Sequence, residues 1–171
     1  MTGSPLRIRD YQADDLEALH RIDRICFDED IAFSQTGLGY HLNHPKSIAR
    51  VAEGLGRILG FVLARMEGSA RAHVITLDVI PEARQRKIGT LLMDTLHEEL
   101  GKQGIHTTIL EVGVRNVAAQ RLYEKLHYQY LGTLAGYYHG REDAYQMTRI
   151  ACSPRMGENE KRRLPLKSLL L

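Results

Sequence analysis

A short basic loop at residues 84–87 is well suited to chemistry, because it stands between a strand-like apolar run and an amphipathic stripe. Arg84, Arg86 and Lys87 supply positive charge, and the stripe that follows predicts a helix. The first turn of a helix leaves its N–H groups unpaired and carries the positive end of the helix dipole. Gly89 lets the backbone of that turn come close to a ligand. This pattern is typical of a phosphate or pyrophosphate site, and the alternative is an ordinary basic helix start.

Two other spacings resemble known sites but have simpler explanations. Gly54-x-Gly56-x-x-x-Gly60 resembles a dinucleotide fingerprint, yet its spacing differs and it lies between two predicted strands, so we interpret it as turn glycines. His41-x-x-His44 has the spacing of some metal sites. Because no third ligand is nearby, we expect surface histidines and no bound metal.

Periodicity predicts the elements that must position these residues. Strands are expected at residues 6–9, 47–53, 57–66, 72–80, 107–112, 128–136 and 143–150. Helices are expected after residues 14–15, at residues 88–100, and after Asn116, whose side chain can cap a helix. Residues 27–45 predict a loop that contains a short helix. The order, a meander followed by strand-then-helix units, indicates a mixed α/β fold.

The composition indicates one globular domain. The chain has 171 residues, of which 43% are hydrophobic and 26% charged, which is enough for a single buried core. No apolar run approaches the ~20 residues that cross a membrane, and the first residues lack the apolar run of a secretory signal. We therefore expect a cytoplasmic protein with no membrane partner. Cys26 and Cys152 are too few for a disulfide framework.

The charge is unevenly distributed along the chain. The formal net charge is +2, and residues 153–171 contribute +3, so residues 1–152 sum to −1. We expect residues 1–152 to form the domain and residues 153–171 to form a basic tail. Because the domain lacks a clustered positive face, we expect no nucleic-acid partner.

Three motifs, in order along the chain, resemble the GNAT acyltransferase superfamily. Arg84-x-x-Lys87-x-Gly89 is similar to the loop with which that superfamily holds the pyrophosphate of acetyl-CoA. Residues 110–128, which open Leu-Glu-Val-Gly-Val-Arg-Asn, resemble its second motif. Residues 137–147, which open Tyr-Tyr-His-x-Arg-Glu-Asp-Ala, resemble the closing hairpin of the protein N-terminal acetyltransferases, and most closely the ribosomal-protein alanine N-acetyltransferase branch.

The resemblance implies a central, largely antiparallel sheet with splayed middle strands flanked by helices, and acetyl-CoA as co-substrate. Backbone N–H near Val79 would polarise the thioester carbonyl, and Asn116 would bond the pantetheine arm or a water. The implied coenzyme contacts are Leu77, Asp78, Val79, Arg84, Gln85, Arg86, Lys87, Ile88, Gly89, Thr90 and Asn116. Lys87 and His127 stand where the superfamily has glycine, and Gly113 where it has arginine. Lys87 would either add a cation to the pyrophosphate site or crowd it, and we favour the added cation.

Acetyl transfer from a thioester to an amine needs a proton acceptor for the amine, a proton donor for the thiolate and fixed placement of both reactants. The resemblance implies that Tyr123 is the donor and that Glu111 is the base, directly or through one water. His73 is the alternative base. Each of these residues also has an interpretation without a catalytic role. Glu111 would face solvent on its strand, His73 would be a half-buried histidine with its hydrogen bonds satisfied, and Tyr123 would pack in the core.

Phe27, Tyr137 and Tyr138 would contact the acceptor. We expect an N-acetyltransferase that acts on the N-terminal α-amine of a protein, with a ribosomal protein as acceptor, and that exists as a monomer or weak dimer. The alternatives are acetylation of a small amine or a lysine, and a coenzyme-binding module without activity. An open groove between residues 27–34 and 137–141 favours a peptide, and a closed deep pocket favours a small molecule.

Overall fold

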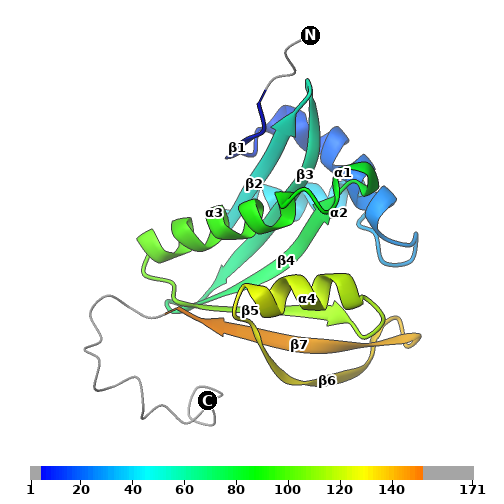
Figure 1. Ribbon diagram of the computed structural model, residues 1–171, viewed down its shortest axis with the longest axis vertical. Helices are drawn as coiled ribbons and strands as arrows, with labels where there is room; N and C mark the ends of the chain where they lie inside the picture. Colours follow the sequence, from blue (N-terminus) through cyan, green and yellow to red (C-terminus); the bar gives the residue numbers. More distant parts are fainter. Residues whose placement is uncertain (1–4, 152–171) are drawn as a thin grey trace.

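A mixed sheet of seven strands runs through the protein in the order β1-β2-β3-β4-β5-β7-β6, as the computed structural model of residues 5–151 shows (Figure 1). Neighbouring strands are antiparallel except for β4 and β5, which are parallel. The expected α/β fold and its strands are confirmed. The strands are β1 (Arg7–Asp10), β2 (Ser47–Gly54), β3 (Arg57–Glu67), β4 (Arg71–Val79), β5 (Thr107–Gly113), β6 (Gln129–Tyr138) and β7 (Glu142–Ile150).

Helices cover both faces of the sheet. Helix α3 packs against β2, β3 and β4, and α1 packs against β3 and β4 from the opposite face, where α2 also lies (Figure 1). The helices are α1 (Leu16–Cys26), α2 (Gln35–Leu42), α3 (Ile88–Lys102) and α4 (Val117–Lys125), with 3-10 turns η1 (Ala13–Asp15) and η2 (Pro81–Ala83). Leu92, Leu96 and Leu100 of α3 are buried, which confirms the stripe predicted from the sequence. The short helix expected within residues 27–45 is α2.

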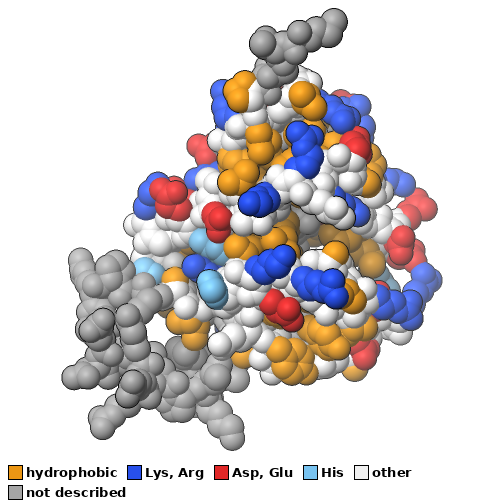
Figure 2. All heavy atoms as spheres, viewed as in Figure 1, with side chains coloured by type: hydrophobic (Ala, Val, Ile, Leu, Met, Phe, Trp, Pro, Cys, Tyr) orange, Lys and Arg blue, Asp and Glu red, His pale blue; other side chains and the backbone are white. Residues whose placement is uncertain are grey.

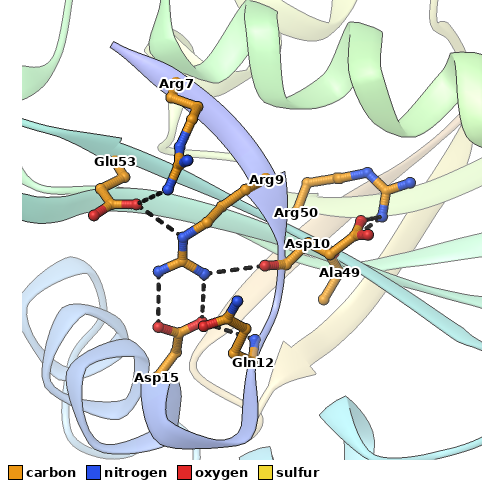
Figure 3. Close-up of polar contacts among 8 residues, drawn as sticks. All are labelled: Arg7, Arg9, Asp10, Gln12, Asp15, Ala49, Arg50 and Glu53. Carbon is orange, nitrogen blue, oxygen red and sulfur yellow. Dashed lines mark hydrogen bonds and ion pairs between the residues drawn. The ribbon is translucent and has the colours of Figure 1, made fainter. Parts of the chain in front are cut away.

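An ion-pair cluster ties the first strand to the first helix (Figure 3). Arg9 donates through two nitrogens to the carboxylate of Asp15, at 2.7 and 2.8 Å, and a third nitrogen bonds Glu53 of β2. The hydrogen bond from Arg9 holds the pKa of Asp15 below its ordinary value. Because Asp15 immediately precedes α1, the cluster fixes where that helix begins and therefore where the α1–α2 loop leaves it.

The sheet opens between β4 and β5. These strands pair only over their first residues, where Arg71, Ala72 and His73 face Thr107, Thr108 and Ile109. In β4 the pairing with β3 skips Ile75, because Leu63 faces Thr76 while Ala64 faces Val74. A bulge of this kind bends its strand and increases the local twist. The expected splay of the middle strands is confirmed, and the bulge gives its physical cause.

The tail predicted at residues 153–171, and Cys152 beside it, lie outside the described residues. Within residues 5–151, no helix is long and apolar enough to cross a membrane.

Candidate active site

A cavity of about 460 Å³ lies where β4 and β5 part. Its walls include the diverging strands, the end of β3, the loop between α1 and α2 with part of α2, helix α4, and the β6–β7 hairpin. All of the predicted catalytic and acceptor residues meet here, together with the alternative base and two of the predicted coenzyme contacts. The residues predicted from the sequence that line the cavity are Phe27, His73, Leu77, Glu111, Asn116, Tyr123, Tyr137 and Tyr138.

Glu111 of β5 is the centre of a hydrogen-bond network in this cavity. Its Oε2 lies 2.5 Å from Nε2 of His73 and accepts from the hydroxyl of Tyr137 at 3.3 Å. Its Oε1 accepts from the amide of Gln146 at 3.0 Å. The Glu111 side chain is only 8% exposed, which rules out the solvent-facing glutamate considered from the sequence. The two candidate bases, Glu111 and His73, are therefore one hydrogen-bonded pair.

The surroundings of the pair favour the charged form of each partner. The hydrogen bond to Glu111 raises the pKa of His73 above its ordinary 6.5, against burial, which lowers it. Burial raises the pKa of Glu111, but the hydrogen bonds from His73 and Gln146 outweigh it and hold that pKa below 4.5. Glu67 lies 3.5 Å from Nδ1 of His73 and also favours the imidazolium. His73 thus stands between two carboxylates.

Tyr123 of α4 lines the cavity and is 7% exposed, with its ring 5.6 Å from that of Tyr128. Burial raises the pKa of its phenol well above the ordinary value, so the hydroxyl keeps its proton at physiological pH. A protonated phenol in the cavity can act as a proton donor. The raised pKa also makes the phenol a weaker acid, and the proton-donor role of Tyr123 stays a prediction.

Two tyrosines of the β6–β7 hairpin form the side of the cavity nearest solvent. The rings of Tyr137 and Tyr138 meet edge to face at 5.0 Å. Arg141 of the hairpin forms an ion pair with Asp30 of the α1–α2 loop, and both side chains are largely exposed. The two walls expected to flank the acceptor are thus bridged across the rim of the cavity by an exposed contact.

The basic loop opens α3 as expected. Lys87 is the N-cap residue, and no side chain caps the helix, so the N–H groups of the first turn remain for a ligand. Arg84, Arg86 and Lys87 are exposed. Lys and Arg side chains gather above and below a hollow between α3 and α4 (Figure 2). Donors and charge of this kind fit the pyrophosphate of a coenzyme.

The structure also explains the departures from the superfamily's glycine positions. Lys87 and His127 have φ of 62° and 67°, the left-handed region that glycine adopts readily. Gln85 of the same loop has φ of 60°. A side chain at Gly113 would meet Oε1 of Glu142 at 2.7 Å, so Glu142 occupies the space where the superfamily has arginine.

Other predicted coenzyme contacts have a structural part in the fold. A Cβ at Gly89 would meet Leu122 of α4 at 3.2 Å, so this glycine also lets two helices pack closely, and its predicted approach to a ligand stays a prediction. Ile88 and Asp78 are only 2% and 1% exposed, so their side chains pack inside the protein. Val79 binds Arg84 Nε through its carbonyl oxygen at 3.0 Å.

Asn116 and Thr90 lie at helix starts. The side-chain oxygen of Asn116 accepts from Ala119 N–H at 3.1 Å, which confirms the predicted cap. Its amide nitrogen is free to donate into the cavity that the residue lines. Thr90 is in the first turn of α3, half-buried beside the basic loop.

Sequence reasoning missed Arg65 and Glu67 of the cavity wall, and it missed Gln146, which donates to Glu111. Arg65 Nη2 lies 2.7 Å from Nδ1 of His41, and both residues line the cavity. The pairing of β5 with β7 places Gln146 opposite Glu111. Only this register, which the sequence does not state, could have revealed Gln146. Among residues 5–151 no group of three His, Cys, Asp or Glu side chains could hold a metal ion.

Known proteins share this fold and these motifs. An uncharacterized N-acetyltransferase from Methanocaldococcus jannaschii is 35% identical over 141 residues, 82% of this chain and 88% of the relative. An N-alpha-acetyltransferase from Saccharolobus solfataricus is 26% identical over 162 residues, 86% of this chain and 94% of the relative. The crystal structure of the ribosomal-protein-S18-alanine N-acetyltransferase from Escherichia coli superposes with a TM-score of 0.79 at 26% identity, covering 91% of this chain and 98% of that one.

The match to a family as a whole agrees with these individual relatives. Residues 11–128 match the acetyltransferase (GNAT) family, and they include the opening between β4 and β5, the basic loop of α3 and the Glu111 network. This chain therefore belongs to the acetyltransferase (GNAT) family.

Proposed function

We propose that the protein transfers the acetyl group of acetyl-CoA to the α-amine at the N-terminus of a protein, and that it does so in the cytoplasm. The observation that carries this proposal is the His73–Glu111 pair, held at 2.5 Å in the cavity where β4 and β5 part. Acetyl transfer is the reaction of the family, and two relatives are named as N-acetyltransferases of protein termini. A ribosomal protein is our proposed acceptor, because the E. coli structure carries that name.

His73 takes the proton in this proposal, and Glu111 orients it. An ionised carboxylate can only accept a hydrogen bond, so neutral His73 must carry its proton on Nε2, toward Glu111. Its Nδ1 then has the free electron pair that removes the proton from the attacking amine, directly or through one water. Glu67, 3.5 Å from Nδ1, stabilises the imidazolium that forms.

The remaining groups hold the coenzyme and the leaving sulfur. Acetyl-CoA supplies the thioester as the activated acyl donor. Arg84, Arg86 and Lys87, with the uncapped N–H groups of α3, would bind its pyrophosphate, and Asn116 would donate to its pantetheine arm. Tyr123 would protonate the thiolate. Phe27, Tyr137 and Tyr138 would enclose the acceptor.

A small amine is the second candidate acceptor, and one contact favours it. The ion pair between Arg141 and Asp30 joins the two walls of the cavity and narrows the entrance that a peptide must use. Both side chains are more than half exposed, and surface ion pairs of this kind are worth only ~0–1 kcal/mol. A bound peptide can therefore displace the contact at little cost.

A mass-spectrometric screen separates these acceptors. The protein is incubated with labelled acetyl-CoA, a panel of peptides with varied first residues, the same peptides blocked at the α-amine, and small amines. We expect label on free α-amines and none on blocked peptides. Label confined to lysine side chains or small amines would contradict the proposal. Coenzyme binding by calorimetry without thiol release on any amine would leave a binding module instead of an enzyme.

A further inference from the structure

Arg65 is a charged group of the cavity that acetyl transfer, as proposed above, does not use. It lies near the end of β3, directly opposite His73 of β4 in the strand register. Facing residues in such a pair have Cβ atoms about 4.5–5.5 Å apart. Arg65 and His41 of α2 both line the cavity. The arginine is therefore a neighbour of the proposed base.

The guanidinium of Arg65 has no carboxylate partner among residues 5–151, although it is partly buried. The other arginines of similar burial behave differently: Arg9 and Arg50, with side chains 17% and 14% exposed, each pair with two carboxylates. In Arg65, Nη2 bonds His41 and Nε is buried without an acceptor. Removing a charge from water without pairing it costs free energy. An anion that binds the guanidinium of Arg65 would therefore recover part of that cost.

Two of the carboxylates that line the same cavity, Glu67 and Glu111, are already matched with cations. Glu67 pairs with Arg71 at 3.0 Å and lies 3.5 Å from His73, and Glu111 bonds His73. Arg65 has no such carboxylate partner among the described residues, and its guanidinium lies over the ring of Tyr40, 5.6 Å from the ring centre. An anion brought by a ligand would balance its charge.

His41 adds a second hydrogen-bond donor beside Arg65. An arginine only donates, so Nδ1 of His41 must accept at 2.7 Å and its proton must be on Nε2. Burial and the charge of Arg65 lower the pKa of His41, which keeps the ring neutral in this tautomer. A guanidinium and an imidazole N–H together present donors and no acceptor, which is the chemistry that binds a carboxylate.

The coenzyme phosphates are not suited to this place. Their proposed loop follows the far end of β4, and His73 and Val79 are six residues apart along that strand, roughly 20 Å at ~3.3 Å per residue. The acceptor amine, in contrast, must lie beside His73. One residue of an extended peptide spans at most ~3.6 Å, so side chains of the first two acceptor residues come within reach of Arg65.

We propose that Arg65 and His41 bind the side-chain carboxylate of an aspartate or glutamate within the first two residues of the acceptor. The inference rests on the proposed function and names its substrate class, namely protein N-termini that carry an acidic side chain next to the amine. It assigns Arg65 as a residue that determines specificity.

Matched peptides test this with the intact protein. One parent peptide is made with Glu, Gln or Lys at position one or two, and kcat/KM is measured by thiol release. Charge-assisted hydrogen bonds of this kind correspond to about a tenfold preference or more for Glu over Gln in the wild type. In Arg65→Gln the ratio of kcat/KM for the Glu peptide to kcat/KM for the Gln peptide should fall to about one. In Arg65→Glu the preference among the three peptides should shift toward the Lys peptide. Arg57→Gln, an exposed position on the same strand, is the matched control and should keep the wild-type ratio.

The outcomes are distinct. Equal rates on Glu and Gln peptides in the wild type overturn the inference but leave N-terminal acetylation intact, and this comparison needs no variant to fold. An acidic preference that survives in Arg65→Gln also overturns it. No turnover on any peptide, with turnover on small amines, overturns the proposed function and the inference together.

Discussion

Replacing Glu111 with glutamine tests which group takes the proton, because the side chain keeps its shape and loses its charge. Only neutral His73 can accept a proton from the amine, and Glu111 holds the pKa of His73 above 6.5. We therefore expect kcat/KM of the wild type to rise through an acid limb whose midpoint lies above pH 6.5. If Glu111 itself were the base, its pKa below 4.5 would give no such enzymatic limb near neutral pH.

The variant should move this limb to lower pH. The hydrogen bond to Glu111 is the largest influence on the pKa of His73, and without it burial acts to lower that pKa. An opposite charge at hydrogen-bond distance favours the charged form of a titratable group, and we expect the displacement of the limb to be modest. The reason is that the His73 side chain is 27% exposed, so water screens part of the interaction.

Thiol release measured from about pH 5 to about pH 9 with one peptide gives the comparison. The amine of the peptide also ionises in this range, but it does so identically with each variant. A difference in the midpoint of the limb between wild type and variant therefore arises from the protein. Glu67→Gln is the matched control, and it should move the limb in the same direction by less, since Glu67 is the weaker influence on His73. An unmoved limb in Glu111→Gln would refute His73 as the proton acceptor.

Folding should depend on the same pair. The raised pKa of His73 contributes stability that is complete below pH 6.5 and is lost as pH rises through the raised value. The lowered pKa of Glu111 contributes stability that is complete above pH 4.5 and is lost as pH falls. Urea unfolding should therefore show the largest loss for Glu111→Gln at about pH 5.5 and a smaller one at about pH 9.

Three further substitutions follow from the geometry. Tyr123→Phe should lower kcat by about a hundredfold or more while acetyl-CoA affinity, measured by calorimetry, changes little, and unaltered turnover removes Tyr123 from the donor role. Lys87→Gly should raise the free energy of unfolding by about 1 kcal/mol, because glycine adopts a φ of 62° readily, but it should weaken acetyl-CoA binding. His127→Gly is the control: with a φ of 67° and a position away from the basic loop, it should raise the free energy of unfolding and leave acetyl-CoA binding unchanged. Gly60→Ala should cost about 1–3 kcal/mol in urea unfolding, since its Cβ would overlap the carbonyl oxygen of Asp78, and a neutral effect would contradict the close approach of β3 and β4.

Local patterns in the sequence predicted the elements well, because the hydrophobic stripes that define them are short-range. The α3 stripe, the Asn116 cap and the strands of the meander all depend on neighbours within a few residues. The pairing around Glu111 could not be predicted in this way. It depends on His73, 38 residues earlier, and Gln146, 35 residues later, which only the strand register brings together.

The glycine positions show a different kind of limit. The sequence did not predict that Gly89 also has a packing role, in which the missing side chain faces Leu122 across the α3–α4 contact. Lys87 and His127 have left-handed backbone, and their residue types alone give no sign of it. A sequence shows where a glycine lies, but the neighbouring group that leaves no room for a side chain is known only from the fold.

The site depends on incomplete pairing of the sheet. After His73 in β4 and Ile109 in β5, the N–H and C=O groups that point from one of these strands toward the other form no β-sheet hydrogen bonds between the two strands. Buried backbone N–H and C=O groups without partners are costly, so such an opening persists only where something else satisfies them. An extended ligand with amide groups of its own, such as a pantetheine arm or a peptide, can do so when it lies between the strands. The bulge at Ile75, which opens the sheet, thus also favours the binding of an extended ligand with amide groups. A regular β4–β5 ladder would pair the free backbone groups and remove the site.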